Sequence, residues 1–338
     1  MRDVLLPPRE AQLAELERLI RRDPARRGLI EAESQRGPLC PGHLAAAADH
    51  IARFGRSIGI VTGFYIPGAE PPAAETDGPP GAALLAIALS KCGMDVRLMT
   101  DVQCAPAVAS AAREYGLPSD CVVSATGDET AVFFPPDAAR LSHLIAVERV
   151  GPAHSLRSYA GRRPETDPDV QAFRRTMPFP HEDRCHNMRG EIIDAHTAPL
   201  HRVFETVSQL DPGVRTIGIG DGGNEIGMGS VPWDELRQRL NGPSAPLVPC
   251  RVPTDWTIVA GVSNWGAQAL AVAVCHLRGE THHLAEFDLA SEEHRWRAMV
   301  ESGPAVDGVT RLREPTVDGL PFLTYIQPWE GMRRVLGL

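Results

Sequence analysis

A glycine-rich loop that directly follows an apolar segment is the feature of this chain that most restricts its fold. Residues 214–219 are predicted to form a buried strand, and residues 217–229 hold six glycines among thirteen positions. Glycine permits positive φ and lets a bound group approach main-chain N–H groups closely. A loop that only turned the chain would not need Asp221, Asn224 and Glu225. We therefore interpret the loop as part of an active site at the end of a strand, with a purely structural turn as the alternative.

The pattern along the rest of the chain predicts an α/β fold with a mostly parallel sheet and helices on both faces, in a Rossmann-like three-layer arrangement. Apolar segments predict strands at 57–63, 96–101, 121–124, 143–149 and 255–261. Helical spacing predicts helices at 8–22, 41–54, 82–91, 106–115, 197–210 and 267–277, and one that starts at Ser230 with that serine as its cap.

We expect residues 1–338 to form a single domain. Residues 1–40 are interpreted as an N-terminal helical extension. Residues 152–186, which are rich in arginine, proline and acidic side chains, are interpreted as an exposed inserted loop or lid.

Composition excludes several classes of function. A net charge of −9 is unfavourable for a nucleic-acid surface, no apolar run is long enough to span a membrane, and the N-terminus does not resemble a leader peptide. The seven cysteines are scattered, which favours reduced thiols in a cytoplasmic protein. Lys91 is the only lysine, so Schiff-base chemistry with pyridoxal phosphate is not expected. We expect a small-molecule substrate, and the sequence is compatible with a homo-oligomer.

Four polar loops are predicted to follow strands, at residues 75–81, 148–151, 220–229 and 261–264. In open α/β sheets, ligands bind in the crevice beyond the carboxyl ends of the strands. The four loops should therefore contribute to one shared site.

The carboxylates of the glycine-rich loop have two alternative roles. Asp221 and Glu225 could ligate a divalent cation such as Mg²⁺ or Mn²⁺, with Asn224 as a further oxygen donor. Alternatively, one of them binds a substrate ammonium group and the other acts as a general base. No cofactor is inferred to be obligatory.

Other side chains offer binding groups. Arg149 and Arg189 could each bind a substrate carboxylate, or form structural ion pairs instead. Thr76 and Asp77 could cap the helix that follows them, and the N–H groups at its start could hold an anion. Residues 181–186 contain histidine, cysteine and acidic side chains, but their spacing does not favour a zinc site.

The residues alone also allow two other functions. Gly218, Gly220 and Gly223 fit the G-x-G-x-x-G pattern of nicotinamide-dependent oxidoreductases, although no helix is predicted directly after the loop. The same loops could also form a binding domain for an amino acid or nucleotide, without turnover.

Six motifs together resemble the D-glutamate cyclase family. They are Glu-Thr-Asp-Gly-Pro-Pro-Gly (75–81), Glu148-Arg149, Asn-Met-Arg-Gly (187–190), Gly-Asp-Gly-Gly-Asn-Glu-Ile-Gly-Met-Gly (220–229), Ser-Asn-Trp-Gly (263–266) and Thr-Val-Asp-Gly-Leu (316–320). The resemblance covers about residues 40 to 325, and the glycine-rich motif is the most specific part.

The resemblance implies a lyase that cyclises D-glutamate to 5-oxo-D-proline with loss of water. It implies Asp221, Glu225 and Glu148 as catalytic residues, with Glu75 as an alternative acid. The substrate-binding residues that it implies are Arg149, Arg189, Asn187, Asn224, Thr76, Asp77, Gly78, Gly222, Gly223 and Asn264.

Overall fold

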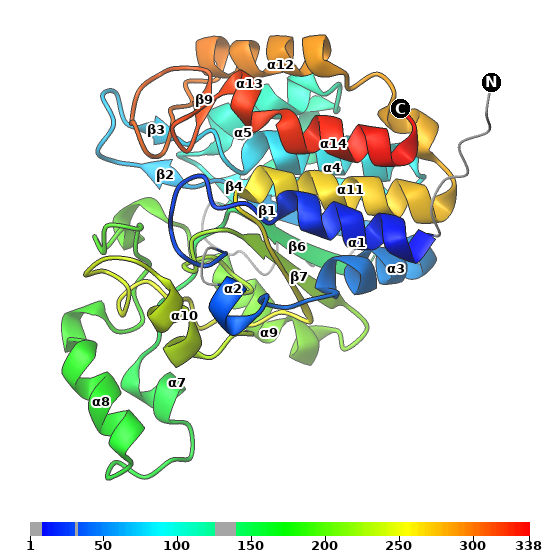
Figure 1. Cartoon of the computed structure of the whole chain (residues 1–338). Coiled ribbons are helices and arrows are strands. Elements are labelled where there is room, and N and C mark those ends of the chain that lie inside the picture. Colours follow the sequence, from blue (N-terminus) through cyan, green and yellow to red (C-terminus); the bar gives the residue numbers. More distant parts are fainter. Residues whose placement is uncertain (1–8, 31–32, 126–139) are drawn as a thin grey trace.

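A six-stranded parallel sheet forms the centre of the molecule (Figure 1). The structure is a computed structural model that describes residues 9–30, 33–125 and 140–338. The strands lie in the order β5-β4-β1-β6-β7-β8, and every neighbouring pair is parallel. Their bounds are β1 (Ser57–Thr62), β4 (Asp95–Asp101), β5 (Val122–Ala125), β6 (His143–Val147), β7 (Arg215–Gly220) and β8 (Trp256–Val259). The predicted α/β fold is confirmed.

Helices connect the strands and cover the sheet. The longer ones are α1 (Arg9–Ile20), α3 (His43–Phe54), α4 (Pro79–Lys91), α5 (Ala105–Glu114), α8 (Pro168–Thr176), α9 (His201–Leu210), α10 (Trp233–Arg239), α11 (Ser263–Arg278), α12 (Leu289–Ser302) and α14 (Gln327–Leu336). The shorter ones are α2 (Glu33–Arg36), α7 (Leu156–Ala160), α13 (Phe322–Tyr325), η1 (Ser119–Cys121), η2 (Phe179–His181), η3 (Asp194–His196) and η4 (Thr281–Leu284). Two small antiparallel pairs complete the fold: β2 (Tyr65–Ile66) with β3 (Ala73–Ala74), and β9 (Thr316–Val317) with β10 (Leu320–Pro321).

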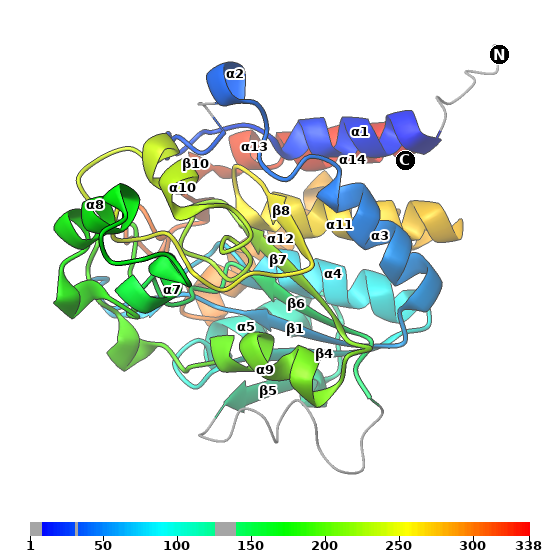
Figure 2. The same cartoon turned by 90° about the horizontal axis from the view of Figure 1, so that it is seen from below.

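The two faces of the sheet bury separate apolar cores because successive residues of a strand point to opposite sides. In β6, Ile145 and Val147 belong to the core shared with α3, α4, α5 and α11. Leu144 and Ala146 belong to the core shared with α9. Figure 2 shows α11 and α9 on opposite sides of the sheet. This arrangement gives the predicted three layers.

Helix α1 is part of the main core. Leu16 and Ile20 of α1 are fully buried, and α1 packs on α11 and α14. Residues 263–275 of α11 are all buried, because helices surround α11 on the side away from the sheet. Within the predicted extension of residues 1–40, residues 1–8 and 31–32 lie outside the described residues. That residues 1–338 form one domain stays a prediction.

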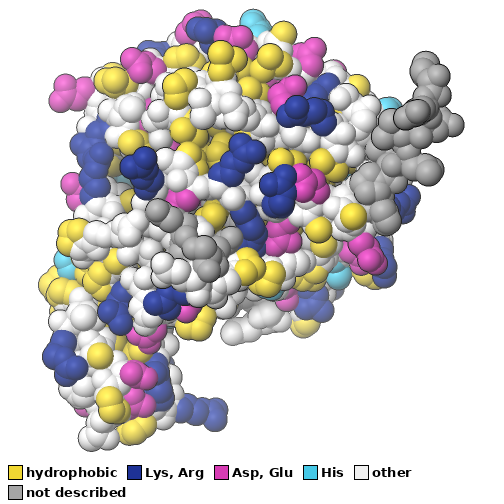
Figure 3. All heavy atoms as spheres, viewed as in Figure 1, with side chains coloured by type: hydrophobic (Ala, Val, Ile, Leu, Met, Phe, Trp, Pro, Cys, Tyr) yellow, Lys and Arg dark blue, Asp and Glu magenta, His cyan; other side chains and the backbone are white. Residues whose placement is uncertain are grey.

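Residues 152–186, which were interpreted as an exposed inserted loop or lid, contain regular structure, and their role as a lid stays a prediction. They include α7 and α8, and Phe173 and Met177 form a small apolar core with Trp233 of α10. The Tyr159 and Phe173 rings stack with centroids 4.4 Å apart. Figure 3 shows this part of the chain as a lobe that projects at the lower left. A few well-placed aromatic side chains therefore order a segment that is otherwise polar.

Two predicted helix starts were wrong. The helix expected from Ser230 is α10, which begins at Trp233 after Pro232, while the Ser230 hydroxyl donates to the Thr254 carbonyl instead. Helix α11 begins at Ser263, four residues before the predicted start, because its first N–H groups find a side-chain acceptor elsewhere in the chain. Within the described ranges, no helix combines the length and the apolar character that a membrane crossing requires.

Replacing Phe173 with Ala should open the lobe without unfolding the sheet. Phe173 is fully buried and contacts Tyr159 and Trp233, so we expect a loss of about 3 kcal/mol in local stability. Hydrogen exchange should become faster in α7 and α8 and stay unchanged in α11. Phe179→Ala, at a side chain that is 84% exposed, is the matched control. Equal acceleration in α11 would contradict an independent lobe core.

Candidate active site

The strand order locates the site. In the doubly wound order seen here, the connections run in opposite directions from β1 and from β6, and ligands bind at the carboxyl ends of such a strand pair. Glu148 follows β6 directly and has φ of 45°, in the left-handed region that side chains rarely adopt. Backbone strain of this kind is concentrated at functional sites.

A cavity of about 250 Å³ opens at this point. Glu75, Glu148, Asn224 and Arg27 line it and are buried or nearly so. Other lining residues are more exposed, among them Asn187, Arg189, Glu191, Val309 and Arg311. The cavity therefore has a floor rich in carboxyl groups and a rim that carries arginines.

The floor belongs to a cluster of buried carboxyl groups, none more than 6% exposed. The cluster consists of Glu75, Asp77, Glu148, Asp221, Glu225, Asp307 and Asp318. Two of its members face the cavity, and burial raises the pKa of both Glu75 and Glu148 well above the ordinary value. The negative charge of Asp318 raises the pKa of Glu75 further, and that of Glu225 does the same for Glu148. Both groups therefore keep a proton at a higher pH than an exposed carboxyl group does.

Arg27 supplies positive charge to this cluster. Its guanidinium donates to Asp221, and its Nη2 donates to Asp318 Oδ1 at 2.7 Å. Burial raises the pKa of Asp221 well above the ordinary value, and the charge of Arg27 opposes that rise. Because Arg27 also lines the cavity, it can contact both the cluster and a bound anion.

Asp77 and Asn264 cap each other's helices. Asp77 accepts hydrogen bonds from the N–H groups of Ser263 and Asn264 at the start of α11, at 2.9 and 2.8 Å. Asn264 Oδ1 accepts from the N–H groups of Gly78 and Gly81 at the start of α4. Asp77 Oδ1 also accepts from the N–H of Gly78 at 3.0 Å, but Gly78 and not Asp77 is the N-cap residue of α4, and most of the hydrogen bonds of the Asp77 carboxylate go to α11. Burial, with a further contribution from Asp318, raises the pKa of Asp77 to about 7.

Four predicted substrate-binding residues therefore have structural partners within the protein. The N–H groups that start α4 donate to Asn264, and Thr76 Oγ1 donates to the carbonyl of Thr316 at 2.7 Å. Thr76, Asp77, Gly78 and Asn264 do not line the cavity. Asp77, Gly78 and Asn264 instead join the starts of α4 and α11.

The glycine-rich loop folds around Glu225. This carboxylate is fully buried and accepts from the N–H groups of Asp221, Gly222 and Gly223, at 3.2, 2.6 and 2.8 Å. These N–H groups are therefore satisfied within the loop, and they do not face a pyrophosphate as the nicotinamide interpretation requires. Asp221 and Glu225 themselves do not line the cavity. The structure thus gives Glu225 a role in organising the loop.

The loop needs glycine because it packs against its own strand. A Cβ at Gly218 of β7 would lie 2.3 Å from the Ile226 carbonyl oxygen and 2.5 Å from Gly227 Cα. Since both are backbone atoms, Gly218→Ala should destabilise the protein by about 3 kcal/mol, measured by urea unfolding. Gly213→Ala is the control, because its Cβ would meet only the Asp211 side chain, at 3.2 Å. Equal stability of the two variants would contradict this close contact.

Arg149 has a different environment from the one predicted. Its side chain is 1% exposed and does not line the cavity. Nη1 donates to Asp101 Oδ2 at 2.7 Å and to the carbonyl of Gly63, and Nη2 donates to the carbonyl of Ala198. These contacts fit the structural alternative, in which Arg149 ties the ends of β1 and β4 to the segment before α9.

Arg189 and Asn187 do lie at the cavity. Asn187 Oδ1 accepts from the N–H groups of Arg189 and Glu191, which fixes the turn at the rim. Arg189 is exposed, and its Nη2 makes a long contact of 3.4 Å with the Val309 carbonyl. Its guanidinium is therefore placed to reach a ligand in the cavity.

The cluster fits a divalent cation. Carboxylate oxygens of Glu148, Asp221 and Glu225 lie within 4.8 Å of one another, as do those of Asp77, Asp221 and Asp318. Within the part of the chain that the structure describes, Asp221 Oδ1 and Asn224 Oδ1 are buried without a hydrogen-bond partner. Oxygen donors of this kind suit Mg²⁺ or Mn²⁺.

Sequence reasoning missed Arg27 and Asp318 as site residues. Asp318 lies in the motif at 316–320, where the sequence Val-Asp-Gly predicts a turn, and this signal could have identified it. In the structure its φ is 53°. Arg27 has no comparable local signal, because 33 of the 34 basic residues are arginines. Only the tertiary structure brings it to the carboxyl groups.

Comparisons with known proteins agree with the motifs. The family model described as D-glutamate cyclase-like, C-terminal, matches residues 16–177 and 179–329. The protein named D-glutamate cyclase, mitochondrial, from Homo sapiens is 29% identical over 342 residues. That alignment covers 92% of this chain and 49% of the human protein, so the chain spans about half the length of this curated relative.

Proposed function

The chain belongs to the D-glutamate cyclase-like family, and from this membership and the acidic cavity we propose that it cyclises D-glutamate to 5-oxo-D-proline with release of water. One observation carries the proposal. Glu75 and Glu148, two buried carboxyl groups whose pKa burial raises, face the same cavity beside Arg27. An intramolecular condensation needs both proton transfer and a cation for the substrate carboxylates.

The reaction forms one bond and breaks another. The α-nitrogen attacks the γ-carboxyl carbon, an N–C bond forms, and a C–O bond breaks to release water. Two protons leave the α-ammonium group, and both end on the departing oxygen. The protein must therefore accept protons on one side of the substrate and donate them on the other.

Glu75 and Glu148 are the proposed proton carriers. One begins as the carboxylate and takes the first proton from the ammonium group, and the other begins protonated and gives its proton to the departing oxygen. The two groups then exchange roles for the second proton, which returns each of them to its starting state. The Ser263 hydroxyl donates to Glu148 Oε2 and fixes the orientation of that carboxyl group. This assignment replaces Asp221 and Glu225 as the base, because those two carboxyl groups do not line the cavity.

Arginines are the proposed partners of the substrate carboxylates. Arg27 lies on the cavity floor, where its charge can stabilise the oxyanion that develops on the attacked carboxyl group. Arg189 at the rim can hold the second carboxylate, and Asn224 Oδ1 can accept from the ammonium group. The substrate then spans the cavity between the acidic floor and the basic rim.

We also propose that Mg²⁺ or Mn²⁺ binds at Asp221 and Glu225, whose oxygens lie within 4.8 Å of one another and of Glu148, where it would neutralise the excess of carboxylates. Asp221→Asn should weaken Mn²⁺ binding more than about tenfold, because one of two charged oxygen donors is lost. Titration followed by the electron paramagnetic resonance of free Mn²⁺ measures this without any turnover. Glu10→Gln, at an exposed position on α1, should bind as the unaltered protein does. Unchanged affinity in Asp221→Asn would place the ion elsewhere.

The activity itself is tested with D-glutamate and L-glutamate separately, each with and without Mg²⁺ or Mn²⁺. Chiral chromatography follows 5-oxoproline. We expect product from the D-enantiomer, and the comparison of metals shows whether the ion contributes to turnover. A folded protein that forms no 5-oxo-D-proline under any of these conditions would overturn the proposal.

A further inference from the structure

A second group of metal-ligating side chains lies at the opposite end of α11 from the cavity. Helix α11 starts beside Asp77 at Ser263 and ends at Arg278. Glu280, His282 and His283 follow directly, in and before η4. This group shares no residue with the acidic cluster of the cavity.

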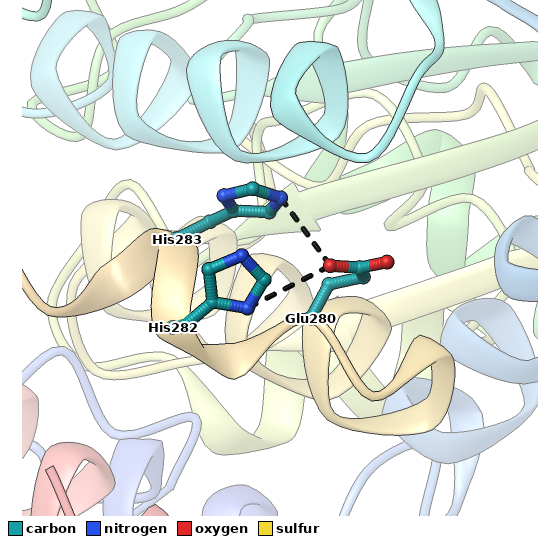
Figure 4. Close-up of side chains that lie close together, drawn as sticks. All are labelled: Glu280, His282 and His283. Atoms are coloured by element: carbon teal, nitrogen blue, oxygen red, sulfur yellow. Dashed lines mark ion pairs between the residues drawn. The ribbon is translucent and has the colours of Figure 1, made fainter.

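The three side chains converge on one point. Figure 4 shows both imidazole rings directed towards the carboxylate of Glu280. His282 Nδ1 lies 3.7 Å and His283 Nε2 lies 3.4 Å from the same oxygen, Glu280 Oε2. All three ligand atoms lie within 4.8 Å of one another.

These separations match a tetrahedral metal site. Zn²⁺ binds imidazole nitrogen and carboxylate oxygen at about 2.0–2.2 Å, so two ligands of a tetrahedral ion lie about 3.3–3.6 Å apart. The distance of 3.4 Å falls within this range and that of 3.7 Å lies just above it, and both are long for direct hydrogen bonds. An ion could therefore enter between the donors with little rearrangement.

The backbone around the group is fixed. Gly279 ends α11 with φ of 77°, and the N–H of Glu280 donates to the carbonyl of Cys275 at 2.8 Å. The N–H of His283 donates to the carbonyl of Glu280, and that of Ala285 to the carbonyl of His282, both at 3.2 Å. The backbone positions of the three residues are thus set by hydrogen bonds that do not involve an ion.

We propose that Glu280, His282 and His283 form a surface site for Zn²⁺, with water completing the coordination. His282 is 67% exposed and Glu280 41%, which leaves room for that water. Imidazole ligands favour Zn²⁺ and its transition-metal neighbours, whereas the oxygen-only cluster of the cavity favours Mg²⁺ or Mn²⁺. The two sites therefore differ in the class of ion that they select. Zinc bound here holds η4 to the end of α11 and stabilises the folded chain.

The test is a Zn²⁺ titration by equilibrium dialysis in millimolar Mg²⁺, which keeps the oxygen-only cluster occupied. We expect His282→Ala and His283→Ala each to lose one equivalent of bound Zn²⁺ or to bind it more than about tenfold more weakly. His294→Ala, at an exposed histidine of α12, is the matched control and should bind as the unaltered protein does.

Co²⁺ provides an independent readout of the geometry. Its visible absorption should be strong, as for a four-coordinate ion, in the unaltered protein and in His294→Ala, and should be lost in His282→Ala and His283→Ala. Melting temperatures without metal identify a variant that fails to fold. Equal Zn²⁺ stoichiometry and equal Co²⁺ spectra in all four proteins would overturn the proposal.

Discussion

Replacing Glu148 with Gln should abolish cyclisation and at the same time stabilise the protein at pH 8. Glutamine keeps the shape of the side chain and an oxygen that can accept from Ser263, but it cannot carry a proton between substrate atoms. We expect turnover to fall by about 10²-fold or more, the usual contribution of a positioned acid or base. Chiral chromatography of 5-oxoproline measures it.

The stability effect follows from the raised pKa of Glu148. Burial, followed by the charge of Glu225, disfavours the ionised form in the folded protein. A carboxyl group with a raised folded pKa contributes its full stability below its unfolded pKa of about 4.3, and loses it as pH rises towards the folded value. A glutamine side chain does not ionise, so Glu148→Gln does not lose stability in this way as pH rises. The free energy of unfolding of Glu148→Gln should therefore exceed that of the unaltered protein at pH 8, with a smaller difference at pH 5.

Urea unfolding at the two pH values, in the presence of a chelator, measures this difference. Glu75→Gln should behave in the same direction, since burial raises the pKa of Glu75 too. Glu10→Gln, which removes an exposed carboxylate, should change neither turnover nor the pH dependence. A Glu148→Gln protein that keeps most of its turnover, or that is less stable than the unaltered protein at pH 8, would contradict the assigned role.

The layers of the fold follow from local signals in the sequence. Each of β1, β4 and β6 is a short apolar segment next to an amphipathic or apolar helix, so the alternation is visible residue by residue. The strand-end loops could be placed for the same reason, because parallel strands bring their carboxyl ends to one edge. Glu148 was found in this way.

The partners of the site residues could not be predicted in the same way. Asp77 precedes α4 and has the pattern of a cap for it, yet it accepts from α11, 186 positions away. Arg149 ends a buried strand, a place that favours a ligand-binding role, yet it pairs with Asp101 of β4. In both cases the hydrogen-bond partner depends on which helix starts and strands become neighbours in the folded protein. A local sequence pattern does not predict those neighbours.

Replacing Arg27 with Met should have the largest effect on stability among the site residues. It removes the positive charge that pairs with Asp221 and Asp318, and leaves both carboxyl groups buried without that partner. Breaking a buried ion pair on one side typically costs about 3–5 kcal/mol. Urea unfolding at pH 8 measures the loss. Arg26→Met, at the exposed neighbouring position, is the matched control and should change little.

The decrease in the free energy of unfolding caused by Arg27→Met should become smaller as pH falls. Arg27 lowers the pKa of Asp221, so its removal lets that carboxyl group take up a proton at higher pH, and the protonated form is tolerated in the interior. The difference from the unaltered protein should therefore be greater at pH 8 than at pH 5. A difference that does not change with pH would show that lost packing, and not uncompensated charge, is the cause.

A double variant separates the two roles of Arg27. In Arg27→Met combined with Asp221→Asn, one uncompensated charge is removed, so part of the lost stability should return, and the two substitutions should not be additive. Turnover should not return, because Arg27 is also proposed to hold the oxyanion on the cavity floor. If turnover recovered together with stability, Arg27 would serve only to neutralise Asp221 and Asp318, and another cation would have to bind the reacting carboxylate.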